Sequence, residues 1–302
     1  MTTIQLTDVV KDIKGKRIID HVSLEMESGK VVGLKGVNGS GKTMLMRLIC
    51  GLIVPTSGSI TINGKRLGKD ITFPESVGIL IENPAFLDAY SGFENLKLLA
   101  SIKNRIGAEK IREVIALVGL DPNDKKKYRK YSLGMKQRLG IAAALLGYPK
   151  VLILDEPTNG LDPAGIQEMR ELICDLPRRF GMTVVVSSHL LSEIDQMADH
   201  VGIIREGELV FQDTLETLHS RSTHHLALRT TNDPVAQALL RDRGLPCQEE
   251  DGYLILPILP DGETARLTGF LAENRLGILR LEERQKSLED IFLELTGKAA
   301  SL

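Results

Sequence analysis

The chain has 302 residues, 42% of them hydrophobic and 26% charged, a composition close to that of ordinary globular proteins, which excludes a disordered or fibrous chain. A formal net charge of -2 gives no general attraction to nucleic acid, so we expect no nucleic-acid partner. Three cysteines, far apart in the sequence, are not the pattern of a disulfide framework. No apolar run approaches the roughly 18 to 20 residues of a membrane-spanning helix, and the N-terminus does not resemble a signal peptide, so we expect a cytoplasmic chain.

Strand signals come first, over residues 1 to about 80. Residues 30–35 read KVVGLK, a short apolar run, and the segment SITINGKRL contains Asn63-Gly64, a dipeptide typical of a hairpin turn. We therefore predict that the chain begins as a sheet.

Helical patterns follow from about residue 86 to residue 147. The residues that recur at spacings of three and four, and so share one helical face, are Ile111, Val114, Ile115 and Val118. Strand signals return in two nearly continuous apolar runs, VLILDE at 151–156 and TVVVSSH at 183–189. Such runs suit central parallel strands that helices cover on both faces, so the core is predicted to be α/β.

The composition changes beyond about Phe211. The stretch DTLETLHSRSTHH at 213–225 is polar, and we predict a linker that exposes His224 and His225. Adjacent histidines point in different directions, so they suit a metal ion poorly. The linker separates a first domain, residues 1–215, from a small α+β domain, residues 216–302.

Two further segments carry local signals. Ser287 and Asp290 have capping-box spacing ahead of apolar residues, which predicts a terminal helix that ends at Gly297. The basic run KKKYRK at 125–130 invites a nucleic-acid or lipid-headgroup interpretation, but one short run in a net-acidic chain predicts a solvated loop.

Residues 36–43 read GVNGSGKT, a full match to the phosphate-binding loop pattern, between an apolar strand and a helical pattern. The glycines allow the backbone to bend with its N–H groups pointing inward, which forms an anion site at a helix N-terminus. Lys42 is expected to reach the β and γ phosphates, and Thr43 to bind Mg²⁺. The predicted nucleotide-binding residues of the loop are Gly36, Val37, Asn38, Gly39, Ser40, Gly41, Lys42 and Thr43. The alternative is a chance glycine turn.

The strand at 151–156 ends in two carboxylates, Asp155 and Glu156, where a purely structural strand would bury no charge. Asp155 is placed to hold Mg²⁺ directly or through a water. Glu156 is expected to act as the base that activates the attacking water. The alternative is that Glu156 only caps the turn that follows.

The segment YSLGMKQRLGIA at 131–142, followed by VLILDEP, NGLDP and SSHLLSE, resembles the ABC ATPase family over about residues 1–215. The resemblance implies a P-loop ABC ATPase fold with a RecA-like core, an antiparallel β subdomain and an α-helical subdomain at about 86–147. It also implies a two-fold dimer, in which the signature motif of one protomer closes over ATP on the P-loop of the other. The signature residues are Ser132, Leu133, Gly134 and Met135; the family's usual glycine and glutamine are replaced by Leu133 and Met135. The alternative for Ser132 is an ordinary helix N-cap.

The same resemblance assigns further residues. Leu161 and Asp162 are the D-loop at the dimer interface, and His189 is the switch histidine that contacts the γ phosphate. Glu82 stands at the glutamine of the Q-loop, and we hypothesise that it binds Mg²⁺ or its water. Ile13 replaces the aromatic residue that stacks on adenine, which leaves the choice between ATP and GTP open.

These motifs predict the ATP-hydrolysing subunit of an exporter, with ATP and Mg²⁺ bound, on the inner face of the membrane beside a separate integral-membrane permease. Glutamate at position 82 resembles the subfamily that exports bacitracin or lantibiotic-type peptides, although sodium, drugs and lipids remain open as cargo. The alternatives are an ABC ATPase that acts on ribosomes or DNA, and a regulatory nucleotide-binding subunit. The small C-terminal domain is expected to support regulation or dimerisation.

Overall fold

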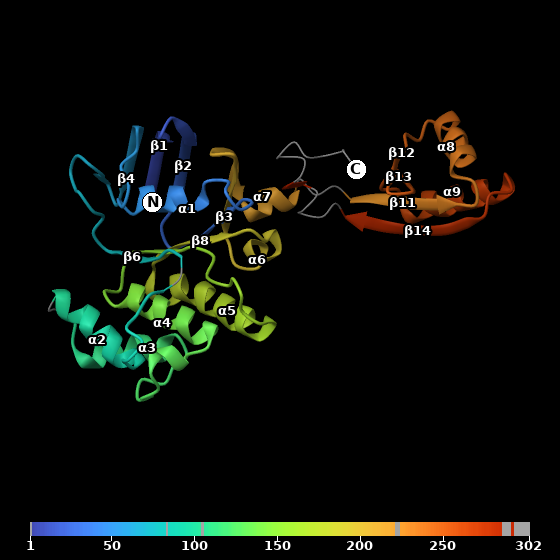
Figure 1. Ribbon diagram of the computed structural model, residues 1–302. Helices are drawn as coiled ribbons and strands as arrows, with labels where there is room; N and C mark the ends of the chain where they lie inside the picture. Colours follow the sequence, from blue (N-terminus) through green and yellow to red (C-terminus); the bar gives the residue numbers. More distant parts are fainter. Residues whose placement is uncertain (1, 83, 104–105, 221–223, 286–290, 293–302) are drawn as a thin grey trace. The chain divides into compact units, whose positions relative to one another are not determined.

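The computed structural model describes residues 2–82, 84–103, 106–220, 224–285 and 291–292. The chain divides into two compact units, Met1–Glu216 and Thr217–Leu302. The first unit holds two sheets and most of the helices, and the second holds one sheet with its own helices (Figure 1). Among the described residues, no helix combines the length and the apolar character that crossing a membrane requires.

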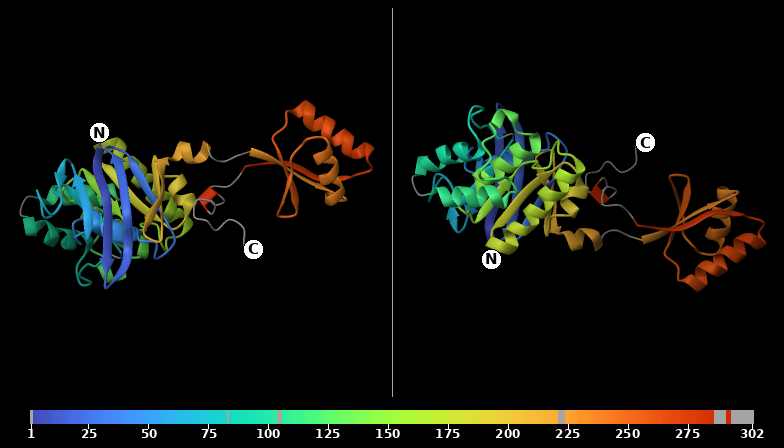
Figure 2. Two further views of the ribbon diagram at one scale, coloured as in Figure 1. Left: turned by 90° about the horizontal axis from the view of Figure 1, so that it is seen from above. Right: turned by 90° about the horizontal axis from the view of Figure 1, so that it is seen from below.

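An antiparallel sheet covers one side of the first unit (Figure 2). Its strand order is β2-β1-β4-β5, with β1 at Thr2–Ile13, β2 at Lys16–Glu27, β4 at Ser57–Ile62 and β5 at Lys65–Arg66. Asn63 and Gly64 connect β4 to β5 with φ angles of 49° and 79°. These left-handed angles are those of a two-residue hairpin turn, so the predicted hairpin is confirmed.

A second, mostly parallel sheet forms the centre of the first unit. Its order is β10-β9-β3-β8-β7-β6, with β10 at Glu208–Thr214, β9 at His200–Arg205, β3 at Val31–Lys35, β8 at Thr183–Ser188, β7 at Val151–Leu154 and β6 at Val77–Leu80. Every residue of β3, β7 and β8 is buried, and the three strands run parallel. The prediction of central parallel strands is therefore confirmed.

Helices fill the space on either side of this central sheet. Helix α1 (Lys42–Ile49) packs between the two sheets, where its Leu45 and Ile49 share one apolar core with both. On the other side lie α2 to α5 (Figure 1). Their bounds are Gly92–Lys103 for α2, Ala108–Leu117 for α3, Leu133–Leu145 for α4 and Pro163–Phe180 for α5.

The helical prediction for 86–147 is confirmed, and its apolar face is buried. The four residues of that face are each 2% exposed or less: Ile111, Val114, Ile115 and Val118. The prediction that 125–130 is a solvated loop is wrong in one respect. Tyr128 opens a short 3-10 helix (Tyr128–Lys130), is 4% exposed, and its hydroxyl donates to the carbonyl of Pro84 at 2.6 Å. The aromatic ring anchors this basic run to the protein, while Lys125 and Lys126 remain exposed and Lys127 is half-buried.

The second unit has a β-α-β-β-α-β order. Its elements are β11 (His224–Thr230), α8 (Asp233–Asp242), β12 (Gln248–Glu250), β13 (Tyr253–Pro257), α9 (Asp261–Glu273) and β14 (Ile278–Gln285). The strands pair antiparallel in the order β12-β13-β11-β14, which is a ferredoxin-like, split β-α-β arrangement. Leucines of β11, β13, α8 and α9 form its core.

The predicted polar linker at 213–225 is wrong. It contains α7 (Leu215–Ser220), and Leu218 of this helix is 0% exposed, so two leucines three residues apart bury one face of a mostly polar helix. His224 and His225 are not linker residues but open β11, where His224 is exposed and His225 is half-buried. The predicted terminal helix with Ser287, Asp290 and Gly297 lies outside the described residues, except for a helical turn at 291–292.

Candidate nucleotide-binding site

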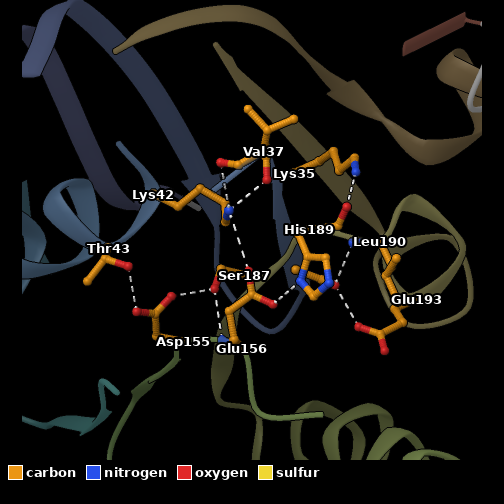
Figure 3. A network of polar contacts seen from close by, with 12 residues as sticks. Lys35, Val37, Lys42, Thr43, Asp155, Glu156, Ser187, His189, Leu190 and Glu193 are labelled. Carbon is orange, nitrogen blue, oxygen red and sulfur yellow. Dashed lines mark hydrogen bonds and ion pairs between the residues drawn. The ribbon is translucent and has the colours of Figure 1, made fainter. Parts of the chain in front are cut away.

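The candidate site lies where β3, β7 and β8 end. Lys35 of β3 pairs with Ser188 of β8, and Leu154 of β7 pairs with Val186 of β8, so the carboxyl ends of the three strands meet at one edge. The glycine-rich loop, the two carboxylates and His189 follow directly after these ends (Figure 3). In open α/β sheets, this edge is where ligands bind.

The glycine-rich loop has the backbone shape that an anion site needs. Gly39 and Gly41 have φ angles of 81° and 110°, and a Cβ on Gly36 would lie only 2.3 Å from Ser40 Oγ. Helix α1 begins directly after the loop, and no side chain caps its N-terminus. The first N–H groups of the helix are therefore available to an anion.

Lys42 folds back over the loop. Its Nζ donates to the carbonyls of Gly36 at 2.6 Å and Val37 at 3.3 Å, and lies 3.4 Å from Glu156 Oε1. The lysine side chain is only 6% exposed. A buried ammonium group thus points into the loop, where phosphate oxygens can replace the carbonyls.

Asp155 is held by two hydroxyl groups. Thr43 Oγ1 donates to Asp155 Oδ2 at 2.7 Å, and Ser187 Oγ donates to Asp155 Oδ1 at 2.6 Å. The hydroxyl of Thr43 and the carboxylate are hard oxygen ligands, which suits Mg²⁺, an ion that takes few protein ligands and completes its shell with water and phosphate. The donor set at this position therefore fits Mg²⁺.

Glu156 connects Lys42 to His189. Its Oε2 lies 2.7 Å from His189 Nδ1, and its backbone N–H donates to Ser187 Oγ at 2.9 Å. Because the carboxylate contacts Lys42 and His189, it does not cap the turn that follows it. Lys35 donates to the carbonyl oxygen of His189 and so holds the histidine backbone beside the glutamate.

Two buried oxygen atoms, Ser40 Oγ and Glu156 Oε1, have no hydrogen-bond partner within the part of the chain that the structure describes. Ser40 belongs to the loop, and Glu156 Oε1 has the charge of Lys42 beside it, at 3.4 Å. Buried polar atoms are nearly always hydrogen-bonded, so both atoms fit a site that a polar ligand completes.

The signature residues lie apart from this cluster, at the start of α4. Ser132 is exposed and caps the helix, because its Oγ accepts from the N–H of Met135 at 3.3 Å. Both interpretations of Ser132 therefore remain compatible with the structure. Leu133 is 44% exposed. Within the described residues, no hydrogen bond or ion pair joins the signature residues to the P-loop, Asp155, Glu156 or His189.

The D-loop lies beside the signature. A Cβ on Gly134 would lie 3.6 Å from Leu161 Cδ2, and a Cβ on Gly160 would lie 2.8 Å from Leu133 Cδ2. Asp162 caps α5 by accepting from the N–H of Gly165 at 3.0 Å. One chain thus brings the signature and the D-loop together on one surface.

Glu82 and Ile13 are not drawn into the cluster. Glu82 follows β6 with a φ of 61°, and its carboxylate forms an ion pair with Arg47 of α1. Arg47 lies one helical turn after Thr43, so the ion pair holds the glutamate beside α1. Ile13 ends β1 at the hairpin turn and is 36% exposed. The phosphate loop packs instead against β2, where a Cβ on Gly41 would lie 2.9 Å from Ile19 Cδ1.

Sequence reasoning missed three polar residues that support the cluster. These are Lys35, Ser187 and Glu193, with exposed fractions of 6%, 0% and 7%. Their signal in the sequence was weak: a lysine and a serine in nearly apolar strands, and a single glutamate in the segment that follows the second strand.

Comparison with known proteins gives a consistent answer. A family model described as ABC transporter matches residues 19–159. The bacitracin transport ATP-binding protein BcrA of Bacillus licheniformis is 40% identical over 300 residues, which cover 98% of this chain and 98% of that protein. The lantibiotic transport ATP-binding protein SrtF of Streptococcus pyogenes is 42% identical over 205 residues, which cover 67% of this chain and 87% of that protein.

Solved structures share the architecture. A structure described as the ATP-binding subunit of an ABC transporter is 27% identical, with a TM-score of 0.64 over 72% of this chain and 92% of that chain. A dimeric ATP-binding cassette bound to ADP and Pi has the same fold, with a TM-score of 0.63 at 24% identity over 70% of this chain and 98% of that chain. These matches confirm the fold that the motifs predicted.

Proposed function

Because the chain belongs to the ABC transporter family as an ATP-binding and ATP-hydrolysing subunit, we propose that it is the motor of an exporter of a peptide antibiotic or another drug. The observation that carries the mechanism is the joined cluster of Lys42, Glu156 and His189 at the end of the phosphate loop. The position of this cluster beside the loop supports a γ phosphate bound between these groups.

ATP binding rearranges this cluster. The N–H groups of the loop and of the first turn of α1 hold the phosphates. The ammonium group of Lys42 leaves the carbonyls of Gly36 and Val37 for phosphate oxygens, which also frees Glu156. The carboxylate of Glu156 then takes a proton from the attacking water, and His189 contacts the γ phosphate. A positioned base of this kind contributes about 10²- to 10⁴-fold in rate.

Thr43 and Asp155 would hold Mg²⁺ in this site. When bound, the ion would offset the negative charge of the triphosphate. We propose that Glu82 adds to this metal site, directly or through a water, once it leaves Arg47. The pairing with Arg47 supports this proposal, because it keeps the carboxylate near α1 and the residues that follow the loop.

The signature residues complete the site from a second copy of the chain. Ser132 offers its hydroxyl, and Gly134 its N–H at a helix N-terminus, to the γ phosphate on the partner's P-loop. Leu161 and Asp162 line the same interface. The exposure of Ser132 and Leu133 supports this arrangement, because it leaves the start of α4 open to a partner.

A permease on another chain docks on the helical part of the first unit. Four apolar side chains that are exposed by 40% or more lie together there: Leu87, Leu98, Leu99 and Ile102. They line a shallow groove of about 370 Å³ between the segment after Glu82 and α2. Exposed apolar patches of this kind mark interaction surfaces. The proposed location is therefore the inner face of the membrane, against that permease.

The proposed cargo is a peptide antibiotic or another drug. Glu82 and the relatives that are named for bacitracin and lantibiotic transport support peptide-antibiotic export. The second unit has its own core, and we propose that it serves regulation or dimer support. Deleting the chain after Ser220 and finding unaltered hydrolysis and dimerisation would contradict this role.

The first experiment compares Glu156→Gln with the unaltered chain, by ATP hydrolysis and by light scattering with ATP. We expect hydrolysis to fall about 10²- to 10⁴-fold while the variant forms a more stable ATP-bound dimer, since the base is lost and the phosphate contacts remain. Normal hydrolysis by the variant would show that Glu156 is not the base. Absence of an ATP-bound dimer in both forms would contradict the composite site for the isolated chain.

A further inference from the structure

Glu193 is a buried acidic residue that nucleotide binding leaves without a role. It lies in α6 (Leu191–Asp195), just after β8, and is 7% exposed. Burial of a carboxyl group is costly unless hydrogen bonds replace its water. Two hydroxyl groups do so here: Thr158 Oγ1 donates to Glu193 Oε2 at 2.8 Å, and Ser188 Oγ donates to the same oxygen at 2.6 Å.

The two donors belong to the two segments that carry the reacting groups. Thr158 follows Glu156 by two residues, and Ser188 directly precedes His189. Ser188 Oγ also accepts from the N–H of Leu190 at 3.0 Å, which leaves its own proton for Glu193. One carboxyl oxygen thus bridges the segments that follow β7 and β8; Figure 3 shows Glu193 beside His189 and Leu190.

This bridge lies where the backbone no longer holds the two segments together. The ladder between β7 and β8 ends at Leu154 and Val186, before Glu156 and His189. Beyond it, Ser187 ties the segments at Asp155, and Glu193 ties them at Thr158. Thr158 and Ser188 are 2% and 0% exposed, so these hydrogen bonds are shielded from water and hold their geometry more strongly than exposed ones.

The bridge also reaches the D-loop. The carbonyl of Thr158 accepts from the N–H of Leu161 at 3.2 Å, so the turn that starts the D-loop is built on the residue that Glu193 holds. A displacement of Thr158 therefore moves Glu156 on one side and Leu161 on the other.

We propose that Glu193 is a positioning residue for hydrolysis: it fixes the Glu156–His189 pair, and the D-loop with it, through Thr158 and Ser188. The inference rests on the proposed roles of Glu156 and His189. It predicts that Glu193 acts on the chemical step and not on the P-loop, since its hydrogen bonds in the described part of the chain go to Thr158 and Ser188.

The test measures kcat and KM for ATP in the full chain, with Tm as the control for folding. Glu193→Ala is expected to lower kcat about 10- to 100-fold, the effect of displacing a reacting group by about 1 Å, with KM nearly unchanged. Glu193→Gln keeps an oxygen acceptor at the same reach and is expected to retain most of the activity. Equal losses in both variants, or a rise in KM without a fall in kcat, would overturn the proposal.

The second arm places Glu193→Ala in a His189→Ala background. If Glu193 acts through His189, the added substitution lowers kcat far less than it does alone. The same factor in both backgrounds would overturn the inference while leaving His189 its role. If His189→Ala alone hydrolyses normally, the proposed role of His189 fails and this inference fails with it.

Thr158→Val is a second variant that tests the same proposal if Glu193→Ala does not fold. It removes one donor, replaces the hydroxyl with a methyl of similar size, and leaves Glu193 bonded to Ser188. We expect a several-fold lower kcat with KM unchanged, about the effect of one buried hydrogen bond. An unaltered kcat in a folded Thr158→Val chain would overturn the proposal.

Discussion

The phosphate side and the signature side of the first unit are built differently. On the phosphate side, Lys42, Asp155 and Ser187 are nearly buried and joined in one polar network. On the signature side, Ser132 is exposed and makes only a helix cap, and Leu133 lies open to solvent. The phosphate half of the nucleotide site is thus built within the chain, and the signature half is exposed on its surface. The proposed dimer requires this arrangement, because the exposed half of one chain has to meet the phosphate half of another.

Among the substitutions that test this contrast between the two sides, Gly134→Ala is expected to have the largest effect on hydrolysis. Within its own chain an added Cβ would meet only Leu161, at 3.6 Å, so we expect the Tm to stay the same or rise. Against a partner's phosphate, the extra methyl costs about 1 to 3 kcal/mol. We therefore expect hydrolysis and ATP-dependent dimerisation to fall about tenfold, as measured by phosphate release and light scattering.

Gly269→Ala in α9 is the matched control, because Gly269 is also a helix glycine and nothing lies within 4 Å of its added Cβ. It is expected to leave hydrolysis unaltered. If Gly134→Ala hydrolyses and dimerises like the unaltered chain, the signature side does not approach a phosphate, and the contrast between the two sides has another cause.

A smaller effect is expected at the ion pair of Arg47 and Glu82. Both partners are partly exposed, and such pairs contribute at most about 1 kcal/mol. Glu82→Gln should therefore change Tm little. If Glu82 contributes to the metal site, the Mg²⁺ concentration for half-maximal hydrolysis should rise about two- to fivefold.

Arg47→Gln is the control, since it frees the carboxylate and should lower that Mg²⁺ concentration. Unchanged Mg²⁺ dependence and unchanged transport in Glu82→Gln would remove Glu82 from the metal site. The carboxylate would then serve only its pair with Arg47.

The smallest effect is expected at a helix N-terminus. In the part of the chain that the structure describes, no side chain caps the start of α1 beside the phosphate loop, whereas side chains cap the start of α2. At the start of α2, Ser91 and Glu94 form a full capping box: the N–H of Ser91 donates to Glu94 Oε2 at 2.6 Å, and the N–H of Glu94 donates to Ser91 Oγ at 3.3 Å. These bonds, with the Ser91 backbone N–H first, lower the pKa of Glu94 from 4.5 to about 2.

A lowered pKa in the folded state means that Glu94 stabilises the protein above the unfolded pKa, and that this contribution is lost as the pH falls toward the folded pKa. Glu94→Gln should thus lower Tm slightly at neutral pH, and the difference should shrink below about pH 4.5, as followed by thermal unfolding. A difference that grew on acidification would contradict this assignment.

Local rules recovered much of the fold. The turn at Asn63-Gly64, the buried strands β7 and β8, and the apolar face that includes Ile111 were predicted from periodicity and turn chemistry, because each depends on residues close together in the sequence. The same rules failed at α7, where two leucines gain their burial from packing that a polar composition does not reveal.

The sequence by itself determined which chemical groups the site contains, since the loop with Lys42 and the carboxylates after β7 follow fixed spacings that chemistry imposes. Only the tertiary structure decided how these groups pair. Glu156 meets His189 across 33 residues, Glu82 meets Arg47 across 35, and Glu193 meets Thr158 across 35. Such pairs depend on which strand and helix ends pack side by side, and no local period in a sequence encodes that.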